Sequence, residues 1–174
     1  LLMAPRLSTA ATLQVGINKP YQTIAAAVTA ALPGSLIEID AGIYANEAIT
    51  INKDNLTLRG VGGRAHVRWG TGNYLTNTAM IGNGKGIFVI SAANATIENM
   101  EFSGAKVVDQ NGAGIRYEGG NLTIRGSYFH DNENGILGEG GMSNTLLIEN
   151  SIFERNGYCP VDCAHNVYIG LMGT

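Results

Sequence analysis

The amino-acid sequence predicts an all-β fold, a parallel β-helix (solenoid) of about five turns with a short N-terminal capping α-helix. Two observations predict the solenoid: a strand-and-turn motif recurs four times, and Gly- and Asn-rich pairs separate the copies. The copies begin at residues 55, 94, 121 and 145, so their starts lie 39, 27 and 24 residues apart. These spacings lie within or near the range in which each repeat forms one turn of a solenoid. The four motifs are Asn55-Leu-Thr-Leu-Arg-Gly60, Asn94-Ala-Thr-Ile-Glu-Asn99, Asn121-Leu-Thr-Ile-Arg-Gly126 and Thr145-Leu-Leu-Ile-Glu-Asn150.

Alternation along each motif predicts which side chains enter the core, because successive residues of a strand point to opposite faces. The predicted core positions are Leu56, Ala95, Leu122 and Leu146, with Leu58, Ile97, Ile124 and Ile148. The last outward position carries Arg59, Glu98, Arg125 and Glu149. Equivalent residues of stacked parallel strands lie about 4.8 Å apart. Opposite charges therefore become neighbours, which we interpret as fixing the register and not as a catalytic feature.

Other signals recur in phase with the motif. Phe102, Phe129 and Phe153 each follow the Ile of their repeat by five residues, and a second apolar strand beginning Gly-Ile precedes several motifs. The Asn-x-Thr triplets that begin at residues 55, 94 and 121 match a glycosylation pattern. They share one repeat position, so a stacked Asn turn explains them without modification. The recurring Phe and Gly-Ile signals, together with the motif strand, predict two or three short strands in each turn.

Length and charge limit the function. The 174 residues are the length of one domain, and 45% hydrophobic residues is ordinary for a packed chain. A net charge of −3 gives no general attraction to nucleic acid. No apolar run reaches the roughly 18–20 residues that span a bilayer. We therefore expect neither nucleic acid nor membrane as a partner.

The predicted organisation has three parts. Residues 1–12 are a signal-peptide remnant or a disordered tail, in which Ser8 and Ala10 fit a small-x-small cleavage site. Residues 13–45 form the N-terminal cap and first turn, and residues 46–174 form β-helix coils without a C-terminal cap. An open end would pair with another chain, most simply as a homodimer, or the sequence is a fragment of a longer β-helix.

A nearby cysteine pair fits an exported protein. Cys159 and Cys163 are predicted to form a disulfide, which indicates a secreted or periplasmic location. With His165 they also offer three metal ligands, but structural zinc sites normally have four. We therefore favour the disulfide and predict no metal there.

The N-terminal segment predicts a helix followed by a strand. Ile24, Val28 and Leu32 lie on one face of an Ala-rich helix over about residues 23–32, and Pro33-Gly34 ends it. Residues 36–40 alternate as a strand, and residues 41–44 turn the chain. A single amphipathic helix before a solenoid is expected to cover its first turn.

The segment Tyr21 to Tyr44, with its Thr-Ile helix, Pro-Gly break, Ile-x-Ile strand and Gly-x-Tyr turn, resembles the right-handed parallel β-helix proteins of the pectate-lyase-like superfamily. With the repeated motifs, the resemblance covers most of residues 13–170. It implies a right-handed β-helix and an exported protein that binds or acts on polysaccharide, related to uronan lyases or epimerases. It also allows a Ca²⁺ ion, although no dense Asp cluster is visible, and we predict no cofactor. One fold hosts many functions.

The candidate catalytic residues come from aligning the last two full repeats. This alignment places His130 beside Glu154 and Asp131 beside Arg155, with Tyr128 and Glu101 on the same outward row. β-Elimination on a uronate needs a base and a cation that neutralises the carboxylate. The predicted catalytic residues are His130, Asp131, Glu154 and Arg155. His130 or Tyr128 would be the base or acid, and Arg155 with Arg125 would neutralise the substrate. A purely structural row of opposite charges is the alternative.

Further residues are predicted to bind substrate. They are Asp109, Arg116, Tyr117, Arg125 and Tyr128, since Tyr presents an apolar ring and a polar tip to a sugar. Residues 60–86, with Trp69 and Tyr74, interrupt the repeat and are expected to form a protruding loop. His66 is isolated in the sequence and receives no role. The alternative function is a non-catalytic carbohydrate-binding or assembly module that associates through its open end.

Overall fold

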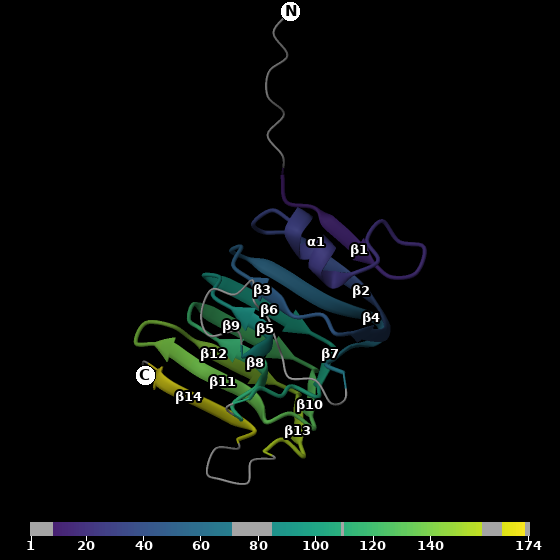
Figure 1. Ribbon diagram of the computed structural model, residues 1–174. Helices are drawn as coiled ribbons and strands as arrows, with labels where there is room; N and C mark the ends of the chain where they lie inside the picture. Colours follow the sequence, from purple (N-terminus) through teal and green to yellow (C-terminus); the bar gives the residue numbers. More distant parts are fainter. Residues whose placement is uncertain (1–8, 71–84, 109, 158–164, 173–174) are drawn as a thin grey trace, which may run out of the picture.

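A computed structural model describes residues 9–70, 85–108, 110–157 and 165–172. The described strands stack as a parallel β-helix, with the N-terminal segment at one end and the last strand at the other (Figure 1). The strands of the described residues all pair in parallel. The predicted all-β solenoid is therefore confirmed.

Three faces enclose the core. The first face contains the starts of β2 (Leu36–Ala45) and β4 (Leu56–Arg68), with β1 (Thr12–Val15), β6 (Asn94–Glu98), β9 (Asn121–Arg125) and β12 (Leu146–Glu149). The second face contains the ends of β2 and β4, with β7 (Met100–Ser103), β10 (Tyr128–His130) and β13 (Ile152–Glu154). The third face contains β3 (Ile49–Ile51), β5 (Gly86–Ile90), β8 (Ala113–Tyr117), β11 (Asn134–Gly141) and β14 (Val167–Met172).

The core follows the predicted alternation. Leu58, Ile97 and Ile124 are fully buried and paired in register, and the aligned residues that precede them by two are also buried. The predicted core residues of the last copy, Leu146 and Ile148, are only partly buried and pack against this core. Phe129 stacks between Phe102 and Phe153, with ring centroids 5.0 and 4.7 Å apart. Apolar residues at equivalent positions thus form continuous columns through the molecule.

A tight corner joins the first and second faces. Asn99 has φ of 53°, and its side-chain amide donates to the carbonyl oxygens of Gly60 and Gly63 at 2.9 and 2.8 Å. A Cβ on Gly60 would lie 2.1 Å from the Asn99 carbonyl oxygen, so only glycine fits. β4 bends at this corner and continues to Arg68. The prediction of a loop from residue 60 is therefore wrong for residues 60–68, and Tyr74 lies outside the described residues.

The polar rows on the surface also match the repeat. Asn94 donates to Asn55 at 3.1 Å, and Asn121 donates to Asn94 at 2.9 Å. On the first face, Arg59 pairs with Glu98 at 2.7 Å, and Arg125 contacts both Glu98 and Glu149. Exposed pairs of this kind contribute little stability but disfavour a shifted register.

The predicted N-terminal helix is present but shorter than expected. α1 runs from Ile24 to Ala30 and begins at Thr23, whose hydroxyl accepts a hydrogen bond from the Ala26 amide. It lies over the first strands (Figure 1), with Ile24 and Val28 buried. The helix ends at Ala30 because the backbone of Ala31 is already extended, with ψ of 148°. Leu32, which precedes Pro33, is disfavoured in the helical conformation and lies outside the helix. The described part of the chain contains no helix with the length and hydropathy of a membrane span.

Candidate functional site

The strand register forms two outward columns on the second face. Alternate residues point outward, and the strands pair in register in the order β2, β4, β7, β10 and β13. The first column is Ile43, His66, Glu101, Tyr128 and Ile152. The second column is Ala45, Arg68, Ser103, His130 and Glu154. Ionisable groups therefore gather in the middle of this face.

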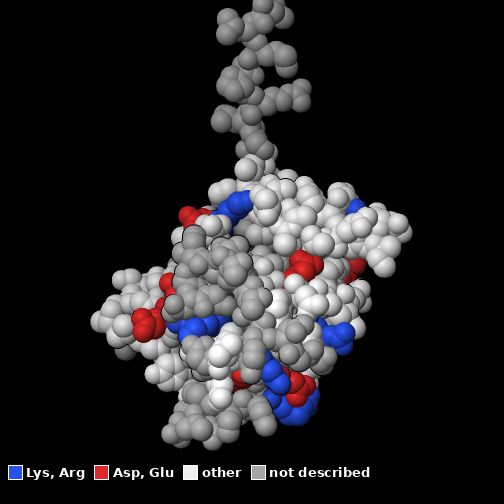
Figure 2. Space-filling model, viewed as in Figure 1, with Lys and Arg blue, Asp and Glu red and all other residues white. Residues whose placement is uncertain are grey.

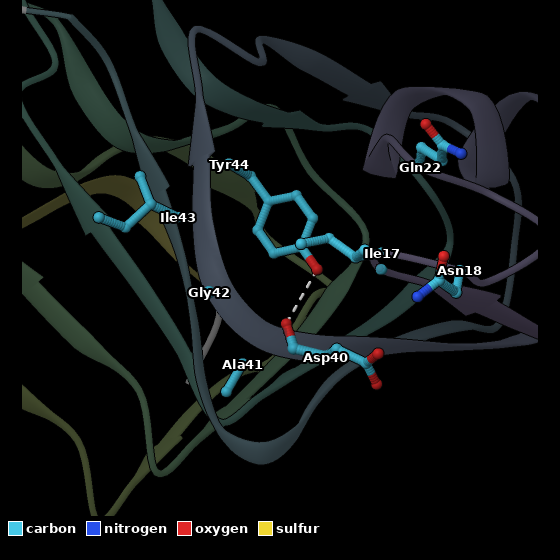
Figure 3. Close-up of a pocket in the computed structure, with 9 residues that line it drawn as sticks. Ile17, Asn18, Gln22, Asp40, Ala41, Gly42, Ile43 and Tyr44 are labelled. Atoms are coloured by element: carbon cyan, nitrogen blue, oxygen red, sulfur yellow. Dashed lines mark hydrogen bonds between the residues drawn. The ribbon is translucent and has the colours of Figure 1, made fainter.

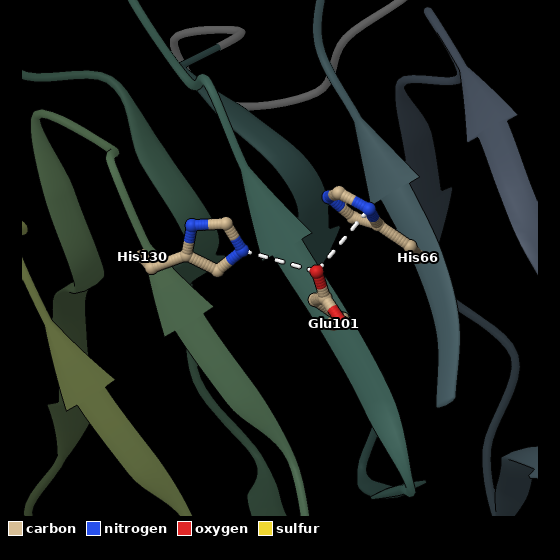
Figure 4. Close-up of side chains that lie close together, drawn as sticks. All are labelled: His66, Glu101 and His130. Atoms are coloured by element: carbon tan, nitrogen blue, oxygen red, sulfur yellow. Dashed lines mark hydrogen bonds and ion pairs between the residues drawn. The ribbon is translucent and has the colours of Figure 1, made fainter. Parts of the chain in front are cut away.

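His66, Glu101 and His130 form a half-buried cluster, which we call the His–Glu–His cluster (Figure 4). Nδ1 of His66 lies 3.2 Å from Oε1 of Glu101, and Nε2 of His130 lies 3.1 Å from the same oxygen. The side chains of His66, Glu101 and His130 are 17%, 23% and 14% exposed. Burial lowers the pKa of His66, while the charge of Glu101 acts in the opposite direction.

A chain of hydrogen bonds orients His130. Its Nδ1 lies 2.6 Å from Oδ2 of Asp131, and the guanidinium of Arg155 donates to both Asp131 oxygens at 2.9 and 3.1 Å. Hydrogen bonds from Arg155 and then His130 lower the pKa of Asp131 to about 2. Asp131 is therefore a fixed acceptor, and His130 directs its other nitrogen toward Glu101.

Tyr128 and Glu154 complete the patch. The Tyr128 hydroxyl donates to Glu154, which also accepts from Arg155. The hydrogen bond to Glu154 raises the pKa of Tyr128, and the same bond lowers the pKa of Glu154. The Tyr128 ring also stacks on His130, with centroids 4.3 Å apart. Tyr128 thus stays protonated at neutral pH and can donate, but not readily accept, a proton.

A cavity of about 290 Å³ adjoins this patch. It shares Ser103 and Asp131 with the patch, because these residues contact His66 and His130. Its other lining residues are Arg68, Trp69, Gly70, Gly104 and Lys106. Figure 2 shows acidic and basic side chains gathered over the region of β10 and β13, with smaller charged groups elsewhere on this face.

The structure brings together His130, Asp131, Glu154, Arg155 and Tyr128 as the sequence alignment predicts. Three other predicted substrate-binding residues that the structure describes, Arg125, Arg116 and Tyr117, are not part of this patch. Arg125 lies on β9 of the first face, and Arg116 lies on β8, where it pairs with Glu118. Tyr117 is fully buried, so the prediction that its ring stacks on a sugar is wrong. Its hydroxyl donates to the Gly120 carbonyl, which explains how the polar tip is accommodated in the core.

Several predicted residues lie outside the described part of the chain. These are Asp109, the pair Cys159 and Cys163, and the N-terminal residues 1–8. The structure therefore does not test the disulfide or the export signal.

A second cavity, of about 410 Å³, lies near the N-terminal end (Figure 3). Asp40 and Tyr44 line it, and the Tyr44 hydroxyl donates to the Asp40 carbonyl oxygen at 2.9 Å. Burial raises the pKa of Tyr44. The cavity has one acidic residue and no imidazole among its lining residues, so it offers fewer groups for catalysis than the second face.

Sequence reasoning missed His66. Its partner in the stack is Glu101, 35 residues later in the sequence, because residues 69–85 lengthen that turn. The sequence signal that could have located His66 is its neighbour Val67. Once Val67 is aligned with Phe102 as the inward residue of its strand, His66 falls beside Glu101.

Among the described residues, the His–Glu–His cluster is the one group of three His, Cys, Asp or Glu side chains with ligand atoms within 4.8 Å of one another. Two imidazoles do not suit Ca²⁺, which takes oxygen ligands.

The fold defines the class of protein. A family model described as "Right handed beta helix region" matches residues 41–170, and the chain belongs to this family. The predicted right-handed parallel β-helix is thus confirmed. No curated protein sequence is significantly similar to the chain.

Solved structures with a similar fold include several pectin methylesterases. Pectin methylesterase PemA from Erwinia chrysanthemi has a TM-score of 0.58 and 18% identity, with 84% of this chain and 50% of that chain covered. The enzyme from Aspergillus niger has a TM-score of 0.50 and 14% identity, with 86% and 59% covered. A pectin methylesterase variant in complex with a hexasaccharide has a TM-score of 0.51 and 18% identity, with 91% and 60% covered. At these identities the likeness shows the fold, and the chain spans 50% to 60% of the length of these proteins.

Proposed function

We propose that this chain binds an acidic polysaccharide across the second face and carries out proton transfer on it. The polymer would be a uronate, and the reaction a β-elimination or an epimerisation. One observation carries the proposal: a cavity lined by two basic residues, Arg68 and Lys106, and by Asp131 adjoins the patch that contains His130. The likeness to pectin methylesterases supports polysaccharide as the class of ligand.

The cavity has the chemistry that a uronate requires. Arg68 and Lys106 supply positive charge for the sugar carboxylate, and a guanidinium can bind a carboxylate through two parallel hydrogen bonds. Trp69 supplies an aromatic surface for the apolar face of a sugar ring. Arg155 is already engaged by Asp131 and Glu154, and Arg125 pairs with Glu149 on the first face, so we assign carboxylate recognition to Arg68 in place of Arg155 and Arg125.

Proton transfer would depend on His130. Its Nδ1 donates to Asp131, which Arg155 holds in place, so Nε2 carries the lone pair that can accept a proton. Asp131 and Arg155 are then positioning residues, and Tyr128, whose ring stacks on His130, supplies a hydroxyl that can return a proton. Both reactions begin with removal of the proton next to the uronate carboxylate, so both need these groups.

A panel of uronate polymers tests the activity. Wild-type protein should release unsaturated product, detected by ultraviolet absorbance, or exchange the sugar's C5 proton with deuterated solvent. The exchange assay detects epimerisation that absorbance misses. We expect at least a tenfold loss in His130→Ala, in line with general base contributions of about 10²–10⁴. Arg59→Gln on the first face is the matched control and should retain full activity. Less than a tenfold loss in His130→Ala would remove the imidazole from the mechanism.

A second candidate is a non-catalytic binding or assembly module. Apolar side chains of the last described strands are exposed: Ile152 is 48%, Tyr168 is 52% and Leu171 is 64% exposed. Such a surface fits another β-rung, from a second copy or from a longer polypeptide. Light scattering of the purified chain distinguishes a homodimer from a monomer. A strict monomer would count against self-association.

We also propose that the protein is exported and that Cys159 and Cys163 are bonded. Thiol titration of protein purified from an oxidising compartment should find no free thiol before reduction and two after it. Two free thiols without reduction would contradict the proposed disulfide.

A further inference from the structure

We infer that His66, Glu101 and His130 bind one divalent transition-metal ion, with Zn²⁺ as the representative ligand. The three residues come from β4, β7 and β10, on successive turns of the second face. Their ligand atoms lie within 4.8 Å of one another (Figure 4). Two imidazoles and one carboxylate, with a further position open, are a common protein ligand set for zinc and related metals.

The observed distances are close to those that a metal requires. Ligand atoms about 2.1 Å from a tetrahedral zinc lie roughly 3.4 Å from one another. In the structure, Oε1 of Glu101 is 3.2 Å from Nδ1 of His66 and 3.1 Å from Nε2 of His130. The ligand atoms of His66 and His130 lie within 4.8 Å of one another, so the two imidazoles would have to move closer together to bind one ion. The side chains of the cluster are 14–23% exposed, which leaves an approach for a water ligand.

The hydrogen bonds behind the cluster provide a second, independent observation. Both oxygens of Asp131 accept from Arg155, so Asp131 is an acceptor and Nδ1 of His130 must donate to it. Nε2 of His66 lies 2.7 Å from the hydroxyl of Ser103, which can accept its proton. Metal-ligating histidines almost always donate their other N–H to such an oxygen.

These bonds leave lone pairs that face one another. With Nδ1 protonated, Nε2 of a neutral His130 points a lone pair at the carboxylate oxygen of Glu101, 3.1 Å away. Two acceptors at this distance repel each other unless a proton or a cation lies between them. A metal ion satisfies His66, Glu101 and His130 together, whereas one proton bridges a single pair.

The ligand types also predict selectivity. Imidazole suits Zn²⁺, Co²⁺, Ni²⁺ and Cu²⁺, whereas Ca²⁺ and Mg²⁺ prefer oxygen ligands. We therefore expect Ca²⁺ to leave this cluster empty even at a large excess.

The test is a calorimetric Zn²⁺ titration of the full chain with Cys159→Ser and Cys163→Ser, because these thiols and His165 could bind zinc by themselves. We expect one equivalent of Zn²⁺ to bind, and Co²⁺ to give the visible absorption of a low-coordinate site. His66→Gln and His130→Gln should each weaken binding at least tenfold. His165→Gln and Glu149→Gln are the matched controls and should bind as the parent does. Circular dichroism confirms that each variant is folded.

Asp131→Asn gives a second readout that leaves all three ligands intact. We expect zinc affinity to fall about tenfold, because outer-shell partners typically contribute about 10–100-fold. Two results would overturn the inference. The first is that the protein with Cys159→Ser and Cys163→Ser binds no zinc, whether or not wild-type protein does. The second is that zinc binding is unchanged in folded His66→Gln and His130→Gln variants.

The inference is independent of the proposed activity, because the titration contains no polysaccharide. A protein that binds uronate but no zinc refutes only the metal site, and the converse refutes only the proposed function. If both hold, Nε2 of His130 cannot be a metal ligand and a base at once. Zinc should then slow proton abstraction, and a chelator should restore it.

Discussion

At the residue scale, the site depends on hydrogen bonds that run from Arg155 through Asp131 to His130. Asp131 and Arg155 occupy equivalent corner positions after the second face, with φ of 54° and 50°. This left-handed backbone turns both side chains toward each other on neighbouring turns, where the Arg155 Nε lies 2.9 Å from Asp131. The same residues therefore shape the corner and orient the imidazole of His130.

The inward neighbour of His130 supplies a stability prediction. Phe129 is fully buried and stacked on both sides, so Phe129→Ala should lower the free energy of unfolding by about 3–5 kcal/mol. Urea denaturation measures this change. Tyr128→Phe, one residue earlier and outward-facing, is the control and should stay within about 1 kcal/mol of wild type. If Phe129→Ala lowered the free energy of unfolding no more than Tyr128→Phe does, the Phe stack would not contribute to the stability of the core as predicted.

At the element scale, the bend of β4 positions the site. The bend separates residues 56–59, which pair with β6, from residues 65–68, which pair with β7. Only after this corner does His66 come into register with Glu101. The sequence of the corner thus determines whether His66 reaches the cluster.

Gly60→Ala tests the corner directly. The new methyl group would lie 2.1 Å from the Asn99 carbonyl oxygen, a backbone atom that cannot move away cheaply. We expect a loss of about 1–3 kcal/mol in the free energy of unfolding and weaker zinc binding. Gly42→Ala, in the corresponding bend of β2, is the control because no atom lies within 4 Å of its added carbon. Similar losses in both variants would contradict the steric explanation.

At the scale of the whole molecule, the periodic features were predictable and the irregular ones were not. Repeats 24 and 27 residues apart gave the correct partners for His130, Glu154 and Tyr128, because stacked turns preserve register. His66 was missed since the turn that contains it is longer than the others. Tyr117 was wrongly predicted to face outward because tyrosine has a polar hydroxyl. Its strand is buried at four of five positions, so the polarity of a residue in it does not indicate that the side chain points to solvent. The Arg68–Lys106 cavity arises from corners of different turns, which no local pattern records.

The most direct test of the proposed polysaccharide site is a calorimetric titration of a galacturonate oligomer into wild-type protein and Arg68→Gln. Wild-type protein should bind, and Arg68→Gln should bind at least tenfold more weakly, because a charged hydrogen bond contributes about 1.5–3 kcal/mol. Arg59→Gln, on the first face, should bind as wild type does. No binding by wild-type protein, or equal binding by Arg68→Gln, would contradict the account.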